Sequence, residues 1–234
     1  MQRYFVSKIK DKKVYFYDSD VHHIKNVMRM RLHDEIIVIN ETQAFIAEII
    51  NLEPLHATII KPYFNDCELS TKIDLFQASI KPNNFEWIVQ KACELGINSI
   101  YQTIFKRTYN STLIKNNRIS TIIKEACEQA RRNYLVNYYE QFSFSELLKV
   151  LLNYDLILVA YENEKQIFLN DIFKENSTYQ KIALVIGPEG GFEQEEIALL
   201  KKINNVVCIS LTKTILRSET ASLYLLANLI NKLI

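Results

Sequence analysis

Apolar and polar residues follow one pattern before residue 62 and a different one after residue 72. In the first part, short segments rich in β-branched and aromatic residues alternate with turn-like clusters at 10–12, 40–42 and 51–54. This spacing is typical of a small barrel of β-strands. The expected strands are residues 3–6, 13–17, 35–39, 44–50 and 57–60.

One helix is expected within this first part, over residues 19–32, with Ser19 or Asp20 as its N-cap. The helix is strongly basic, and two explanations of that charge remain equally open. The basic face is either a solvated surface or a surface that binds phosphate. Its basic residues are Lys25, Arg29 and Arg31.

A change of pattern follows residues 62–66, which are expected to form a linker. From Lys72 onward, apolar strands alternate with amphipathic helices, which predicts a parallel sheet covered by helices on both faces. Asn83 is expected to cap the first helix, Glu86 to complete a capping box, and Gly96 to end the helix. The expected strands are 73–80, 97–105, 156–160, 182–186 and 206–209, and the expected helices include 83–96, 118–132, 142–152, 167–173 and a last one ending at 234.

The chain has only four glycines, and three of them, Gly187, Gly190 and Gly191, lie between the strand 182–186 and an acidic helix start. Glycine permits positive φ and close approach of a ligand to the backbone. The pattern therefore favours a ligand-binding loop at the carboxyl end of a strand over a simple tight turn. Neither a P-loop nor a dinucleotide fingerprint is present. The carboxylate of Glu189 further indicates a small ligand other than phosphate.

A second polar loop at 211–220 follows the strand 206–209, so a pocket with two loop walls is expected in this half of the chain. The last helix is apolar around most of its circumference. Such a helix is buried against a partner or within its own fold. A subunit interface is the favoured explanation, and intramolecular burial is the alternative.

Composition adds limits to this picture. The formal net charge of +1 means that a nucleic-acid partner would require a local basic patch. The four cysteines are widely spaced, which is typical of reduced core residues in the cytosol. No signal peptide or membrane-spanning run is evident, so a cytoplasmic protein is expected. His22 and His23 are adjacent and lack ligand spacing, so no metal site is expected.

Several motifs, taken together, resemble the RsmE family of 16S ribosomal RNA uridine-N3 methyltransferases in the SPOUT superfamily. The most specific are Ile-Gly-Pro-Glu-Gly-Gly-Phe at 186–192 and Ile-Leu-Arg-Ser-Glu-Thr-Ala at 215–221. Further matches at 3–6, 22–31, 81–97 and 125–129 follow the family's order. The resemblance therefore extends over nearly the whole chain.

The resemblance implies an α/β fold with a PUA-like β-barrel that binds RNA over residues 1–70. It implies a SPOUT methyltransferase domain over 71–234, with a parallel sheet, a trefoil knot and an S-adenosylmethionine site within about 156–234. It also implies a homodimer that acts on 16S rRNA within the small ribosomal subunit, without metal and without a membrane. Knots are rare, and no periodicity in the sequence indicates one.

Site residues follow from the same resemblance. Arg217 would stabilise the imidate that forms as N3 of the uracil loses its proton, and Glu219, or a water that it holds, would receive that proton. The alternative for this pair is a structural ion pair at the helix start. The implied cofactor contacts are Ala160, Tyr161, Glu162, Ile186, Gly187, Pro188, Glu189, Gly190, Gly191, Ile209, Leu211, Thr212, Ile215, Leu216, Arg217 and Thr220. The implied RNA contacts are Arg3, Lys25, Arg29, Arg31, Lys106, Arg107, Arg131 and Arg132.

The sequence departs from the family pattern at a few positions. The family usually has glycine where this chain has His33, Arg131 and Thr212, and an acidic residue where it has Lys106. Two other functions remain open: a SPOUT methyltransferase that acts on transfer RNA or on ribose 2′-hydroxyls, and an RNA-binding module without catalysis.

Overall fold

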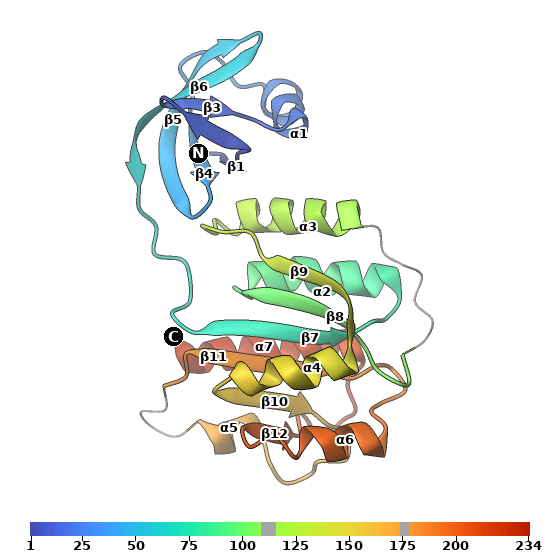
Figure 1. The fold of residues 1–234 in the computed structure, drawn as a ribbon. Coiled ribbons are helices and arrows are strands. Elements are labelled where there is room, and N and C mark those ends of the chain that lie inside the picture. Colours follow the sequence, from blue (N-terminus) through green and yellow to red (C-terminus); the bar gives the residue numbers. More distant parts are fainter. Residues whose placement is uncertain (109–115, 174–177) are drawn as a thin grey trace. The chain divides into compact units, whose positions relative to one another are not determined.

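A computed structural model describes residues 1–108, 116–173 and 178–234 (Figure 1). The chain forms two compact units, each described separately below. The first comprises Met1–Glu68 and Cys127–Leu135, and the second comprises Leu69–Ala126 and Val136–Ile234. The sequence placed the domain boundary near residue 70, close to the first break. It did not predict that Cys127–Leu135 would pack with the N-terminal part.

A six-stranded sheet with the order β1-β4-β5-β6-β3-β2 forms the first unit. β1 runs parallel to β4, and the other pairs are antiparallel. Alternate residues pack into a core that includes Tyr4, Ile36 and Val38. All of the expected strands are present, and β2 is an addition. The strands are β1 Arg3–Phe5, β2 Lys8–Lys10, β3 Lys13–Tyr15, β4 Glu35–Asn40, β5 Gln43–Leu52 and β6 Leu55–Tyr63.

The expected single helix over 19–32 is wrong. A short α-helix, α1 (Asp18–His22), continues into a π-helical turn, His23–Val27, and the helical segment ends there. The N-cap is Tyr17 rather than Ser19 or Asp20. Arg29 has a φ of 50°, which no helix can accommodate. The helical segment is therefore shorter than the sequence predicts.

The second unit has a six-stranded sheet with the order β12-β10-β11-β7-β8-β9, and every pair in it is parallel. The expected parallel sheet is therefore confirmed. β9 was not predicted, because this edge strand is largely polar and exposed and lacks an apolar run. The strands are β7 Lys72–Ala78, β8 Ser99–Ile104, β9 Asn137–Ser143, β10 Leu156–Ala160, β11 Lys181–Ile186 and β12 Val206–Ile209.

The helices of the second unit differ from expectation mainly at their ends. The predicted capping box of Asn83 and Glu86 is wrong, because α2 begins at Pro82 with Lys81 as its N-cap. Proline suits the first helical position, since its fixed φ is helical and its missing N–H is not needed there. Gly96, with a φ of 89°, follows the end of the helix as predicted. The helices are α2 Pro82–Glu94, α3 Asn116–Gln129, α4 Phe144–Val150, α5 Leu169–Ile172, α6 Gln194–Leu200 and α7 Ser218–Leu233.

The last helix, α7, buries one face within its own unit, against α2, β7 and β11. Leu225, Leu226 and Leu229 on this face are fully buried, whereas Tyr224 remains 41% exposed. Intramolecular burial thus accounts for much of its apolar character. A subunit interface on the remaining face stays a prediction, as does the trefoil knot. No helix in the described ranges has the length and apolar character needed to cross a membrane.

Candidate cofactor and substrate site

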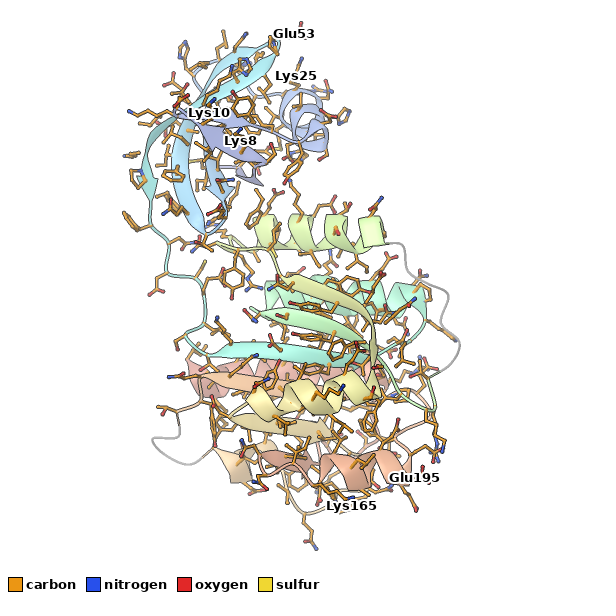
Figure 2. The ribbon with its side chains drawn as sticks, in the orientation of Figure 1. Lys8, Lys10, Lys25, Glu53, Lys165 and Glu195 are labelled. Carbon is orange, nitrogen blue, oxygen red and sulfur yellow. The ribbon has the colours of Figure 1, made fainter. Side chains whose placement is uncertain are left out.

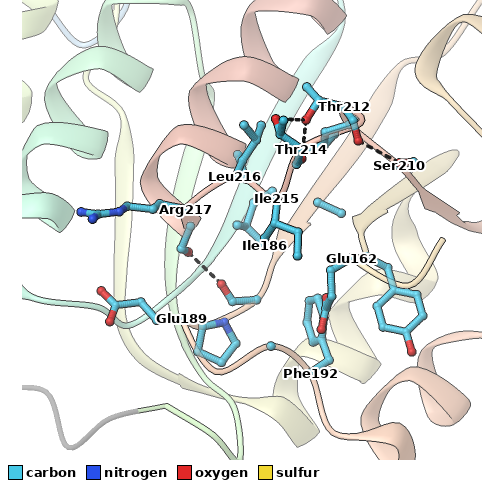
Figure 3. Close-up of a pocket in the computed structure, with 18 of the residues that line it drawn as sticks. Glu162, Ile186, Glu189, Phe192, Ser210, Thr212, Thr214, Ile215, Leu216 and Arg217 are labelled. Carbon is cyan, nitrogen blue, oxygen red and sulfur yellow. Dashed lines mark hydrogen bonds between the residues drawn. The ribbon is translucent and has the colours of Figure 1, made fainter. Parts of the chain in front are cut away.

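A cavity of about 680 Å³ opens at the carboxyl ends of β10, β11 and β12, where parallel strands place ligand sites. The loops that follow these strands form its walls (Figure 3). Residues at the start of α2 also line it. The two loops that the sequence singled out therefore meet. The lining residues are Lys81, Asn84, Ala160, Tyr161, Glu162, Lys165, 186–192, 209–218 and Ala221.

One hydrogen-bond network joins the two loops. The Ser218 hydroxyl, at the first position of α7, donates to the carbonyl of Gly187 over 2.7 Å and accepts from Nε2 of Gln77 over 2.9 Å. Ser222, one turn further along α7, donates to Oε1 of Gln77. Gln77 is fully buried in β7, so its amide is fixed by these contacts. The start of α7 is thereby held at the end of β11.

The glycine loop also depends on close packing. A Cβ on Gly187 would lie 2.8 Å from a ring carbon of Phe192. The Phe192 ring is buried and packs edge-on against Phe105, with 5.2 Å between the ring centroids. Gly191 has a φ of 71°, the left-handed conformation that favours glycine. Glycine is therefore required at 187 for space and favoured at 191 for backbone conformation, two causes that the sequence alone could not separate.

Arg107 and its neighbours hold the outer side of the same loop. Arg107 donates to the carbonyl of Gly190 over 3.0 Å and forms an ion pair with Glu193 at 3.1 Å. The hydrogen bond to Glu193 raises the pKa of Arg107, and the same bond lowers the pKa of the Glu193 carboxyl. The buried Glu196 carboxylate accepts from the backbone N–H groups of Lys106 and Glu193. The segment after β8 is thus fastened to the start of α6.

The second loop is held by its own side chains. The hydroxyl of Thr212 donates to the carbonyl of Thr214 over 2.5 Å (Figure 3). A threonine in place of the family's usual glycine is therefore accommodated by a hydrogen bond within the loop. Ile215, which follows, is 83% exposed although it is apolar and lines the cavity. An exposed isoleucine at a cavity wall indicates an apolar contact for a ligand.

Of the two predicted catalytic residues, Arg217 lines the cavity and Glu219 does not. Arg217 lines the cavity at the start of α7, and its side chain extends away from Ile215 and Glu162 (Figure 3). Its guanidinium has no hydrogen-bond partner among residues 1–108, 116–173 and 178–234. Glu219 and Thr220 do not line the cavity. The assignment of a cofactor contact to Thr220 therefore has no support from this geometry.

Glu219 has a different environment from Arg217. Its Oε1 accepts a hydrogen bond from Nδ2 of Asn84 over 3.0 Å, and its Oε2 is enclosed without a hydrogen-bond partner in the described part of the chain. No Arg217–Glu219 ion pair is formed among these residues, so the alternative explanation of the pair as a structural bridge is not supported.

Two of the predicted RNA contacts require correction. Arg3 and Arg132 are only 5% and 2% exposed, so neither side chain reaches a phosphate at the surface. Arg132 instead pairs with Glu68 over 2.9 Å, and Arg3 donates to Asn133. A side-chain pattern cannot distinguish such buried structural arginines from surface ones.

The other predicted RNA contacts are accessible to different degrees. Lys25 is half-buried and pairs with Glu53 at 2.7 Å, and both residues are labelled in Figure 2. Lys106 pairs with Glu195 at 3.5 Å. The exposed predicted contacts are Arg29, Arg31, Lys106, Arg107 and Arg131.

Several lining residues were missed from the sequence. Lys81 is the N-cap of α2 and Asn84 lies in its first turn, within the motif match at 81–97. Both are far in sequence from the two loops and reach the cavity because β7 neighbours β11 in the sheet. Their position just after a strand was the available signal. The other missed residues adjoin the motifs: Lys165, Phe192, Ser210, Lys213, Thr214 and Ala221. The resemblance had placed Ser218 beside the methyl group and the base, and Ser218 does line the cavity.

The residues present fit S-adenosylmethionine. The cavity volume lies within the range for small-molecule sites, roughly 300–1,000 Å³. Apolar side chains suited to an adenine ring line one part, including Ile186, Leu211 and Ile215. The carboxylates of Glu162 and Glu189 suit a ligand that carries positive charge. No cluster of His, Cys, Asp and Glu that could hold a metal ion occurs in the part of the chain that the structure describes.

Comparison with known proteins agrees with this geometry. Residues 67–230 match the RNA methyltransferase domain family, and residues 16–61 match the RNA methyltransferase PUA domain. Ribosomal RNA small subunit methyltransferase E of Bacillus subtilis is 31% identical, and the match covers 97% of this chain and 95% of that one. The protein of the same name from Mesomycoplasma hyopneumoniae is 28% identical over 98% and 99% of the two chains.

Solved structures show the same relationship. Ribosomal RNA small subunit methyltransferase E from Neisseria gonorrhoeae, bound to S-adenosylmethionine, superimposes with a TM-score of 0.84. It is 26% identical, and the match covers 99% of this chain and 97% of that one. A putative methyltransferase from Legionella pneumophila with bound S-adenosylmethionine gives a TM-score of 0.85 at 25% identity. The match covers 98% of this chain and 96% of that one. From its two domains and the full-length similarity, the chain belongs to the ribosomal RNA small subunit methyltransferase E family.

Proposed function

We propose that this protein methylates N3 of a uridine in 16S rRNA with S-adenosylmethionine as the methyl donor. The observation that supports this most directly is the hydrogen bond from Ser218 to the carbonyl of Gly187. It joins the glycine loop and the Arg217 loop around one cavity, as a site for a donor and an acceptor requires. Relatives named ribosomal RNA small subunit methyltransferase E support the substrate.

The bound cofactor supplies an electrophilic methyl group. The chain's own residues orient the reactants and stabilise the negative charge that develops on the base. The neutral N3 of uracil is a poor nucleophile, so it must lose its proton before or during attack. Arg217, at the rim with an unpaired guanidinium in the described ranges, stabilises the resulting negative charge on the base. The two loops hold base and donor in line, and orientation of this kind contributes a large part of a rate enhancement.

The proposal extends to partners and place of action. The protein acts in the cytoplasm on 16S rRNA within the small ribosomal subunit, and it works as a homodimer. Two exposed apolar residues, Tyr224 of α7 and Ile234 just after the helix, support a further interface. RNA phosphates are bound by the exposed basic residues, so binding should weaken as the salt concentration rises. Arg3 and Arg132 are left out of this set because they are buried.

The test is transfer of labelled methyl groups to unmodified small-subunit particles, followed by nucleoside analysis of the RNA. We expect 3-methyluridine. Label on a ribose 2′-hydroxyl, or transfer only to tRNA, would refute the proposed substrate. Arg217→Ala should reduce kcat by about 10²- to 10³-fold, as loss of one charge-stabilising group does. Its affinity for S-adenosylmethionine, measured by calorimetry, checks that the loops are intact. Unimpaired transfer by this variant would refute the role of Arg217.

A further inference from the structure

Asn84 and Glu219 form a polar pair where α2 and α7 pack together. Nδ2 of Asn84 donates to Oε1 of Glu219 over 3.0 Å. Asn84 lines the cavity and Glu219 does not, so Asn84 is the member of the pair that a substrate can reach. Neither residue pairs with Arg217 among the described residues.

The carboxylate determines which way the amide points. An ionised carboxylate only accepts hydrogen bonds, so the nitrogen of Asn84, and not its oxygen, must face Glu219. Oδ1 of Asn84 is thereby directed away from Glu219, and no hydrogen bond to it is formed by residues 1–108, 116–173 or 178–234. An isolated asparagine could rotate its amide freely between two orientations. The hydrogen bond to Glu219 fixes one of the two orientations.

Glu219 is poorly placed to take a proton from the substrate directly. Its Oε1 is engaged by Asn84, and its Oε2 is enclosed without contact to solvent. A proton acceptor must come within about 2.6–3.2 Å of the proton's parent atom or reach it through one water. Asn84, in contrast, lines the cavity.

We propose that Asn84 contacts the target base, and that Glu219 is a positioning residue that fixes the Asn84 amide. This inference rests on the proposed function. The ligand class is a nucleobase whose edge carries both an N–H donor and a carbonyl acceptor, as the imide edge of uracil does. A side-chain amide offers the complementary acceptor and donor, and unstacked RNA bases are commonly read in this way.

The chain offers a matched control for this proposal. Asn83 precedes Asn84 in the first turn of α2, yet it is exposed and lines a separate groove with Trp87 and Arg118. Asn83→Ala and Asn84→Ala therefore remove the same side chain from the same helical turn. Only the second removal changes the cavity. Any general effect of the substitution on α2 should appear in both variants.

The experiment measures kcat and KM for unmodified small-subunit particles, and the affinity for S-adenosylmethionine, in each variant. Loss of hydrogen bonds to the base should raise KM for the RNA substrate about 3- to 10-fold in Asn84→Ala, the range that one or two net hydrogen bonds produce. Cofactor affinity should stay within about twofold of wild type, since the adenine-binding loops are untouched. Asn83→Ala should match wild type in every measurement.

Glu219→Gln separates positioning from proton transfer. A glutamine can still accept from Asn84 but can also donate to it, so the amide orientation is only partly lost. We expect a rise in KM of about 2- to 5-fold and an unchanged pH dependence of kcat/KM. A fall in kcat of about 10²-fold or more, with an altered pH profile, would instead identify Glu219 as the proton acceptor and overturn its positioning role.

The remaining outcomes are equally decisive. If wild type transfers methyl groups and Asn84→Ala behaves like Asn83→Ala, the base contact is refuted while the proposed function stands. If wild type binds S-adenosylmethionine but methylates no 16S rRNA, the proposed function fails, and the assignment of Asn84 fails with it. A variant that has lost cofactor affinity as well as RNA affinity would place Asn84 in the cofactor site and overturn the inference.

Discussion

Gly187→Ala tests whether the cofactor loop needs glycine for space. The added Cβ would lie 2.8, 3.0 and 3.1 Å from three ring carbons of Phe192. Carbon atoms pack comfortably at about 3.5–4.0 Å, so the ring or the loop must move by roughly 0.5 Å or more. Phe192 is 5% exposed and packs on Phe105, so its ring cannot move without disturbing that contact. Overpacking of this kind costs about 1–3 kcal/mol.

Gly190→Ala is the matched control in the same loop. Its Cβ would lie 3.4 Å from Cβ of Arg107, an ordinary contact, and Gly190 does not have a positive φ. The free energy of unfolding of this variant should stay within about 0.5 kcal/mol of wild type. Urea denaturation measures the free energy, and calorimetry measures the affinity for S-adenosylmethionine. Gly187→Ala should lose about tenfold in affinity, equivalent to about 1.4 kcal/mol, as the loop shifts.

A second substitution locates the cause of the loss. Phe192→Leu removes the ring atoms that the new Cβ would meet. Phe192→Leu should therefore lower the free energy of unfolding less in the Gly187→Ala background than in wild type. The coupling energy between the two substitutions should be about 1 kcal/mol or more. Equal stability of Gly187→Ala and Gly190→Ala, or strict additivity with Phe192→Leu, would refute the steric explanation.

Two further predictions follow from the packing of the second unit. Ser218→Ala removes the hydroxyl that joins Gly187 to Gln77 and leaves buried polar groups unpaired. The free energy of unfolding, measured by urea denaturation, should fall by about 1–3 kcal/mol. An unchanged denaturation midpoint would contradict this. Burial raises the pKa of Tyr101 to about 12. The unfolded chain releases this proton near pH 10, so the free energy of unfolding should fall between about pH 10 and 12. Tyr101→Phe should flatten that fall, and an unchanged pH dependence would show that Tyr101 does not contribute to it.

Apolar runs determined much of the fold before any tertiary information. Strands buried on both faces, such as β10 and β11, have continuous apolar sequences, so their position and parallel pairing could be predicted. The edge strand β9 could not, because its exposed residues carry no periodic apolar signal. The helix expected over 19–32 failed for a related reason. One continuous helix was expected there, but the helical segment ends at Val27 and Arg29 has a positive φ.

The sequence by itself determined the two loops of the site, since rare glycines and the Arg-Ser-Glu motif are local features of the chain. Only the tertiary structure decided which distant residues join them. Sheet order brings Asn84 beside Glu219, and burial removes Arg3 and Arg132 from the surface. The physical reason is that local patterns record backbone preference and solvent exposure along one segment. Contacts between segments depend on how strands are ordered and on which faces become enclosed, and neither is encoded within any single stretch.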